Sequence, residues 1–362
     1  MRRFDRAHLT VWNSPGSRRL LAVCSGPSRL LLVLTASILG VAGCEPSPPD
    51  AAPEADPPQE AVVAPEELES RIRAQLDALD ARTALYAKNL PTGREVAIRA
   101  DEPMNTLSVI KLTALVQAYR EAEAGRLELD ARHPILPEDL RRGSGILQTF
   151  DPGLEPTFRD LLTQMIITSD NTATDIVAER LGLDRVNAFL ESEGFQETRF
   201  RMTTGDLFRE VWVQADPAHA DLSHREVYER GFPGDPEASA RTFALEGDST
   251  LWLGRSTARE TGRLLEGIHE GTWTSRENSE EMLAILRRQL SSSRLPRYVG
   301  FEASVAHKTG DWPPFGGSDV GILFHEGGPT VVAIYTGQNR GDFVELERKL
   351  GRIAVELVQG WR

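Results

Sequence analysis

Cysteine is nearly absent from this sequence. The 362 residues include two cysteines, Cys24 and Cys44, and Cys24 lies ahead of an apolar run that has the features of an export signal. Removal of that signal would leave one cysteine, which excludes an intramolecular disulfide even in an oxidising compartment. Packing must therefore stabilise the mature chain.

Metal-ligand spacing and a surplus of basic charge are missing as well. The seven histidines are scattered, with no His-x-x-x-His and no cysteine pair, so we expect no metal and no other cofactor. Six Arg and one Asp precede Cys44, a net charge of +5, so the rest of the chain carries −18 and the total is −13. An acidic surface of this kind argues against nucleic acid as a partner.

One apolar run, residues 30–43, follows a group of arginines. As a helix it would span about 21 Å, short of the roughly 30 Å hydrocarbon core of a membrane, so it predicts an export signal and not a membrane span. The run ends in Val41-Ala42-Gly43-Cys44, which resembles the lipobox of bacterial lipoproteins. The resemblance implies cleavage before Cys44 and lipid attachment to its sulfur, hence an exported protein anchored at the cell envelope. Residues 44–65, rich in Pro, Ala and acids, predict an extended tether.

Strand and helix patterns fill the remaining region, residues 66–362. Leu68, Ile72 and Leu76 predict an amphipathic helix. The predicted strands are residues 83–89, 94–99, 302–308, 319–324 and 330–336, and the further predicted helices are 107–123, 158–167, 172–181, 255–268, 279–290 and 342–358. This order predicts an α/β fold of the α+β type: an antiparallel sheet built from both termini, packed with helices, plus an inserted all-helical lobe. Residues 202–250, interrupted by several prolines, predict a long and mostly irregular insertion.

Three short motifs in the folded region can carry chemistry. Ser108 and Lys111 lie three positions apart at the start of a predicted helix, so the amine can reach the hydroxyl and act on it as a base. Ser169-Asp170-Asn171 connects two helices and can present a hydroxyl and an amide to a cleft, although Ser or Asp there could equally cap the next helix. Lys308-Thr309-Gly310 closes a predicted strand, where the first two side chains suit a bound carboxylate.

In this order, the three motifs resemble the S-x-x-K, S-D-N and K-T-G signature of class A β-lactamases and penicillin-binding proteins. Residues 143–147 resemble the family's G-S-G-x-L loop, and the 61 positions from Ser108 to Ser169 are close to the family spacing. The resemblance implies that Ser108 is acylated, that Lys111 is a base or proton relay and that Ser169 protonates the leaving nitrogen. It also implies that Asn171 holds the substrate's side-chain amide, and that Lys308 and Thr309, followed by Gly310, bind its carboxylate. The backbone N–H groups of Ser108 and Asp311 would form the oxyanion hole.

Two features depart from the class A pattern. The E-x-x-L-N motif, whose glutamate activates the deacylating water, is missing from residues 198–206, and Asp206 and Glu210 are the nearest carboxylates. Asp311, beside the carboxylate-binding pair, would repel an anionic substrate unless its side chain points away. Both features put hydrolysis of a standard β-lactam in question.

The sequence leaves three functions open. The leading hypothesis is a monomeric serine hydrolase that opens β-lactam amides, with slow turnover. The second is a D-alanyl-D-alanine carboxypeptidase, or another amidase or esterase, that uses the same Ser-Lys pair on a peptidoglycan peptide. The third is a non-catalytic lipoprotein that binds peptidoglycan or a partner, against which the intact Ser108, Lys111, Ser169 and Lys308 speak.

Overall fold

The computed structural model describes residues 65–151 and 153–362, all within the second of two compact units, residues 60–362. The predicted signal, Cys44 and the predicted tether lie outside these residues, except that residue 65, assigned to the tether, begins the first helix. A five-stranded antiparallel sheet has the order β2 (Glu95–Ile98), β1 (Arg82–Asn89), β8 (Gly328–Gly337), β7 (Gly316–His325) and β6 (Ala303–Trp312). Because β1 pairs with β8, from Arg82 opposite Gly337 to Asn89 opposite Thr330, both ends of the folded region build one sheet. This confirms the predicted α+β architecture.

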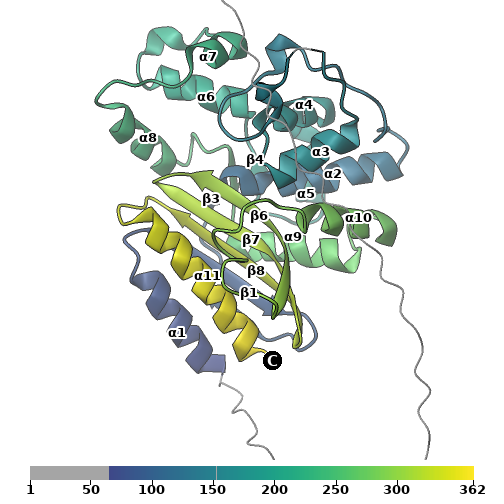
Figure 1. Cartoon of the computed structure of the whole chain (residues 1–362), viewed down its shortest axis with the longest axis vertical. Helices are drawn as coiled ribbons and strands as arrows, with labels where there is room; N and C mark the ends of the chain where they lie inside the picture. Colours follow the sequence, from purple (N-terminus) through teal and green to yellow (C-terminus); the bar gives the residue numbers. More distant parts are fainter. Residues whose placement is uncertain (1–64, 152) are drawn as a thin grey trace, which may run out of the picture. The chain divides into compact units, whose positions relative to one another are not determined.

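Helices cover both faces of this sheet. On one face α1 (Pro65–Asp77) and α11 (Phe343–Gly360) lie side by side (Figure 1). Leu85 and Ala87 of β1 join their core, whereas Ala84 and Tyr86 face the opposite side. This alternation is what the two-residue period of a strand requires. On that opposite side α9 (Ala258–Glu270) packs against β1 and β8, followed by α10 (Arg276–Leu286).

A helical lobe is inserted between β2 and β6. It contains the 3₁₀ turn η1 (Leu107–Ile110), α2 (Lys111–Glu123), η2 (Pro137–Asp139), η3 (Leu147–Thr149), α3 (Phe158–Ile167), α4 (Asn171–Leu181) and α5 (Leu183–Ser192). A small sheet has the order β3 (Met104–Asn105), β5 (Gly254–Ser256) and β4 (Arg199–Phe200); in the chain β3 precedes η1, and β4 and β5 follow α5. The lobe therefore begins directly at the predicted nucleophile.

The prediction of an irregular insertion at 202–250 is wrong. The segment forms α6 (Thr204–Val213), the turn η4 (Pro217–His219), α7 (His224–Arg230) and α8 (Ala238–Gly247). Capping boxes start two of these helices, since Thr203 pairs with Asp206 and Ser223 with Glu226. The prolines that hid a helical period mark boundaries between short helices, and Pro217 begins η4.

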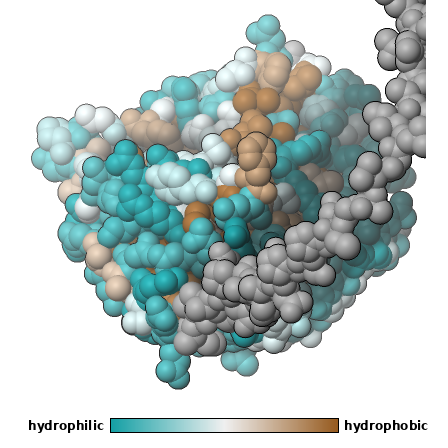
Figure 2. Space-filling view, turned by 60° about the horizontal axis from the view of Figure 1, so that its bottom comes forward, coloured by the Kyte–Doolittle hydropathy of each residue, from teal (hydrophilic) through white to brown (hydrophobic). Residues whose placement is uncertain are grey.

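None of the helices within the described residues is both long and apolar enough to cross a membrane. The face of the molecule in Figure 2 is mainly hydrophilic, with apolar residues gathered in a broken patch. The K-T-G motif does not close its strand as predicted, because β6 continues to Trp312.

Candidate active site

Ser108 is the second residue of η1, a half-buried position that lines a pocket of about 440 Å³. Leu107 before it has a φ of +48°, a conformation that costs a non-glycine residue free energy and is held here by its surroundings. Asn105 Oδ1 accepts a hydrogen bond from Leu107 N at 3.1 Å. The first N–H groups of a helix lack an intrahelical acceptor, so the Ser108 N–H is available to an oxyanion.

Lys111 is the first residue of α2 and is fully buried. Its Nζ donates to Ser169 O at 2.7 Å, Asn171 Oδ1 at 2.9 Å and Ser169 Oγ at 3.2 Å. Burial, and then the charge of Lys308, hold the pKa of Lys111 well below its ordinary value. A depressed pKa favours the neutral amine, which is the form that can act as a base. These hydrogen bonds join Lys111 to Ser169 and Asn171 of the S-D-N motif, and among the described residues none joins it to the Ser108 hydroxyl.

Ser169 lies between two lysines. Lys308 Nζ donates to Ser169 Oγ at 2.9 Å and to Thr309 O at 2.7 Å. Burial lowers the pKa of Lys308 to about 8, because Asp311 and Asp319 offset only part of the desolvation. Ser169 itself has a φ of +55°. S-x-x-K, S-D-N and K-T-G thus meet at one hydroxyl.

The loop at residues 143–147 is fixed to the S-D-N motif. Asp170 accepts from Leu147 N at 2.8 Å, and Ser144 Oγ donates to Ser169 O at 3.0 Å. Gly145 has a φ of +108°, and a Cβ there would overlap the Asp170 carboxylate. Only glycine fits at this position. Asn171 Nδ2 donates one hydrogen to Arg142 O at 2.9 Å, which leaves its second hydrogen for a ligand.

The Asp311 N–H lies at the free edge of the main sheet. Asp311 is opposite Gly317, whose N–H and C=O both bond the Thr336 hydroxyl on the β8 side. Gly317 and Asp311 are therefore a pair without mutual backbone hydrogen bonds, and the Asp311 N–H points away from β7. A Cβ at Gly310 would lie 2.7 Å from Thr106 O, so glycine here lets β6 approach the turn that carries Ser108.

The Asp311 side chain does not carry a free charge beside the carboxylate-binding pair. Its Oδ1 accepts from Nη2 of the buried Arg294 at 2.5 Å, and Arg294 also pairs with Glu347 at 3.2 Å. Burial raises the pKa of Asp311, but the guanidinium of Arg294 outweighs it and holds the pKa below its ordinary value. The repulsion expected from the sequence is thus offset by an ion pair.

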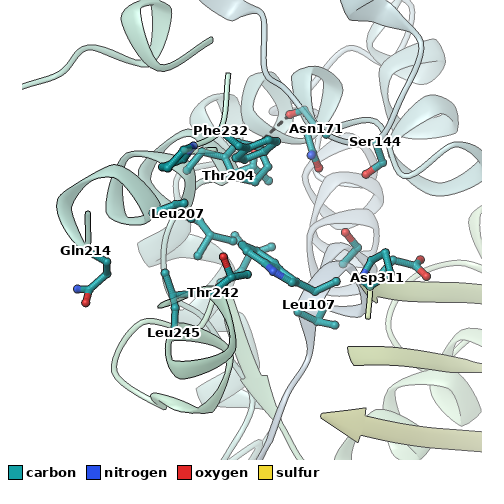
Figure 3. Close-up of a pocket in the computed structure, with 18 of the residues that line it drawn as sticks. Leu107, Ser144, Asn171, Thr204, Leu207, Gln214, Phe232, Thr242, Leu245 and Asp311 are labelled. Carbon is teal, nitrogen blue, oxygen red and sulfur yellow. Dashed lines mark hydrogen bonds between the residues drawn. The ribbon is translucent and has the colours of Figure 1, made fainter. Parts of the chain in front are cut away.

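The pocket has two unlike sides. In Figure 3, Leu207, Thr242 and Leu245 lie on one side, and Asn171, Ser144 and Asp311 on the other. The insertion and the end of β6 supply an apolar wall, defined as Leu207, Phe208, Val211, Phe232, Leu245 and Trp312. Phe208 packs edge-to-face on Phe232 with ring centroids 5.1 Å apart. Asp311 is the only carboxylate among the described residues that line the pocket.

Asp206 and Glu210 do not reach the pocket. The face of α6 that lines it carries Leu207 and Val211, and both acids lie on other faces of the helix. Asp206 accepts from Thr203 in its capping box, and His224 Nε2 lies 3.0 Å from its Oδ1. The hydrogen bond with His224 is the main cause that keeps the pKa of Asp206 far below its ordinary value. Neither residue is placed to activate a water at Ser108.

Sequence reasoning missed the buried ion pair that fixes α6. Asp175 of α4 accepts from Arg141 Nε at 2.6 Å, Thr204 N at 2.7 Å and Gly205 N at 2.8 Å. A carboxylate at a helix N-terminus satisfies free N–H groups and complements the helix dipole. The capping box at Thr203 was the readable signal for this helix. Among residues 65–151 and 153–362, no group of three or more His, Cys, Asp or Glu side chains could hold a metal ion.

The geometry agrees with a match along most of the chain. Residues 67–361 match the model of the beta-lactamase enzyme family. The chain belongs to this family. Two curated members are similar over shorter segments: a β-lactamase of Streptomyces fradiae (30% identity over 138 residues, 36% of this chain and 44% of that protein) and β-lactamase L2 of Stenotrophomonas maltophilia (31% over 118 residues, 32% and 39%). Each matched segment spans less than half of the relative.

Solved structures extend the likeness to the whole folded region. A β-lactamase from Sphaerobacter thermophilus has a TM-score of 0.65 at 24% identity, over 82% of this chain and 97% of that chain. An acyl-enzyme complex of a point mutant of PBP-A with penicillin G has a TM-score of 0.62 at 22% identity, over 81% and 96%. An ancestral class A β-lactamase has a TM-score of 0.64 at 20%, over 81% and 99%. At these identities the likeness establishes the shared fold of this serine hydrolase family.

Proposed function

We propose that this protein opens β-lactam amides by acylation of Ser108. Lys111 Nζ takes the proton of the Ser108 hydroxyl, directly or through Ser169, and Oγ forms a bond to the lactam carbonyl carbon. The oxyanion is stabilised by the N–H groups of Ser108 and Asp311. The C–N bond then breaks, Ser169 gives its proton to the leaving nitrogen, and Lys111 returns one to Ser169. Asn171 would hold the side-chain amide, and Lys308 and Thr309 the carboxylate.

The observation that carries this proposal is the pair of amines on Ser169 Oγ, at 3.2 Å from Lys111 and 2.9 Å from Lys308. A buried lysine whose pKa is depressed is costly for a pure binding protein but required for proton transfer. This argues against the non-catalytic alternative.

Hydrolysis of the acyl-enzyme should be slow. The attacking water is normally deprotonated by a carboxylate within hydrogen-bond reach, and such assistance contributes about 10²–10⁴-fold. Within the described part of the chain, the pocket offers only Asp311, which is held by Arg294. This favours a persistent ester, which is also the behaviour that a penicillin-binding D-alanyl-D-alanine carboxypeptidase would have toward penicillin. That activity is our second candidate.

Intact-protein mass spectrometry after exposure to penicillin G tests the proposal. We expect one adduct per chain, formed rapidly and lost slowly, together with a burst of one product per enzyme. Ser108→Ala should form no adduct, whereas an adduct on that variant would place the nucleophile elsewhere. Fast steady turnover would contradict the expectation that no residue of the pocket acts as the base for deacylation. No adduct on the native protein, with penicillin or with a fluorophosphonate, would favour the binding protein.

We also propose lipid attachment at Cys44, on the strength of the Val41-Ala42-Gly43-Cys44 pattern. Expressed in a bacterium, the full chain should partition with the membrane fraction, and Cys44→Ala should release or misprocess it. A native chain that is recovered uncleaved in the soluble fraction would overturn this assignment.

A further inference from the structure

The insertion gives the pocket an apolar compartment next to the residue expected to hold a substrate amide. A Cβ at Gly143 would lie 2.7 Å from Asn171 Nδ2 and 3.2 Å from Phe208 Cζ, so the Asn171 amide and the Phe208 ring both border Gly143. Thr204 Oγ1 donates to Asn171 O at 3.3 Å, which ties the start of α6 to the same residue. A substituent on an amide held by Asn171 therefore meets α6 first.

Several polar side chains on the insertion side of the pocket already have partners within the chain. Thr204 Oγ1 bonds Asp175 Oδ1 at 2.6 Å and Thr242 Oγ1 donates to Ala238 O at 2.8 Å. Arg241 is paired with Asp235 at 2.5 Å. Against Leu207, Phe208 and Leu245 a polar substituent would lose its water without gaining a partner, which is unfavourable. An apolar substituent would lose nothing and would cover Leu207, Phe208 and Leu245.

We propose that the α6–α8 insertion selects acyl donors whose amide carries an aromatic-sized apolar substituent. The inference rests on the proposed function for the reaction at Ser108, but it concerns a different part of the pocket. Phe208, Phe232 and Trp312 are aromatic, with Phe208 to Trp312 centroids 6.5 Å apart, and rings favour such edge and tilted contacts with another ring.

Two penicillins that differ by one phenyl group test this selection: benzylpenicillin and its acetamido analogue. Both keep the amide and the carboxylate, so they differ only in the compartment they fill. On the native protein, benzylpenicillin should acylate Ser108 about 10- to 100-fold faster. The Ser108→Ala variant, which cannot be acylated, should bind benzylpenicillin more tightly by a similar factor in calorimetry.

Variants on α8 locate the effect. Ala238 lines the pocket, and Ala240 is exposed on the same helix and does not line it. Ala238→Trp should fill the compartment and abolish the preference for the phenyl group, and the matched control Ala240→Trp should keep it. Phe232→Ala, at a position 47% exposed and so of little risk to folding, should reduce the preference. The control Ala240→Trp should leave the rates of both compounds at their native values.

The two proposals fail in different ways. Equal acylation rates for the two penicillins, and equal affinities for Ser108→Ala, would overturn the apolar selection and leave acylation of Ser108 intact. If the native protein forms no adduct but Ser108→Ala binds benzylpenicillin more tightly than the acetamido analogue, the proposed reaction is overturned and the apolar compartment is supported. A preference that Ala238→Trp and Ala240→Trp reduce alike would also overturn the assignment to α8.

Discussion

One side of the pocket carries the three motifs with Ser108, Ser169 and Lys308, and we call it the strand side because β6 closes it. There the amines of Lys111 and Lys308 share Ser169 Oγ, and each is fully buried. On the insertion side, Leu207, Phe208 and Val211 present no hydrogen-bonding atom to the same space. The first side depends on exact distances between charged and polar groups, because unpaired buried charges are costly. The second depends on shape and area, which tolerate change. We therefore expect reactivity to respond sharply to substitution on the strand side, and selectivity to respond on the insertion side.

The largest expected effect is on the strand side. Lys111→Met should slow acylation about 10²–10⁴-fold, because the proton acceptor is removed and the side chain keeps its length. Stopped-flow acylation by a chromogenic cephalosporin, with circular dichroism to check folding, measures this effect. Lys349→Met on α11 is the matched control and should acylate at the native rate. A folded Lys111→Met protein with native acylation would assign the base to another group.

The second largest effect is a loss of stability on the insertion side, where a buried ion pair holds the start of α6. Asp175→Ala leaves Arg141 buried without its carboxylate and frees the N-terminus of α6, so the free energy of unfolding should fall by about 3–5 kcal/mol. Glu179→Ala removes the exposed partner of the same arginine, 3.6 Å away, and should cost at most about 1 kcal/mol. Urea unfolding of both variants gives the comparison. Similar losses for the two variants would mean that α6 is not held by Asp175.

The two sides also differ in how far the sequence alone predicts them. The elements that carry Ser108, Ser169 and Lys308 follow from motifs and from regular periods, and both ends of the main sheet were assigned because their strands are short, apolar and close to turns. The helices of the insertion cannot be assigned in the same way, since they are short and are separated by prolines. Its only local signals are the capping boxes at Thr203 and Ser223.

Contacts between distant segments explain the remaining differences. Arg294 precedes β6 by nine positions and belongs to no motif, so its ion pair with Asp311 depends on how the chain returns to the sheet. Asp206 and Glu210 were selected by position along the chain alone. Because the segment is the helix α6, Leu207 and Val211 face the pocket, and Asp206 and Glu210 do not. A helix face cannot be assigned before the helix itself is recognised.

The smallest effect sharpens the role of charge on the strand side. Lys308, with a pKa of about 8, is cationic below that pH and loses its proton above it. If its charge holds the substrate carboxylate, the acylation rate should fall above about pH 8, by at most tenfold per pH unit. Lys308→Arg keeps a cation at every accessible pH, so its rate, although lower at neutral pH, should not decline between pH 8 and 9.5. Acylation rates of both proteins from pH 6 to 9.5 give the two profiles. A decline shared by both would assign the titration to a group other than Lys308, and a flat native profile would mean that substrate binding does not need this charge.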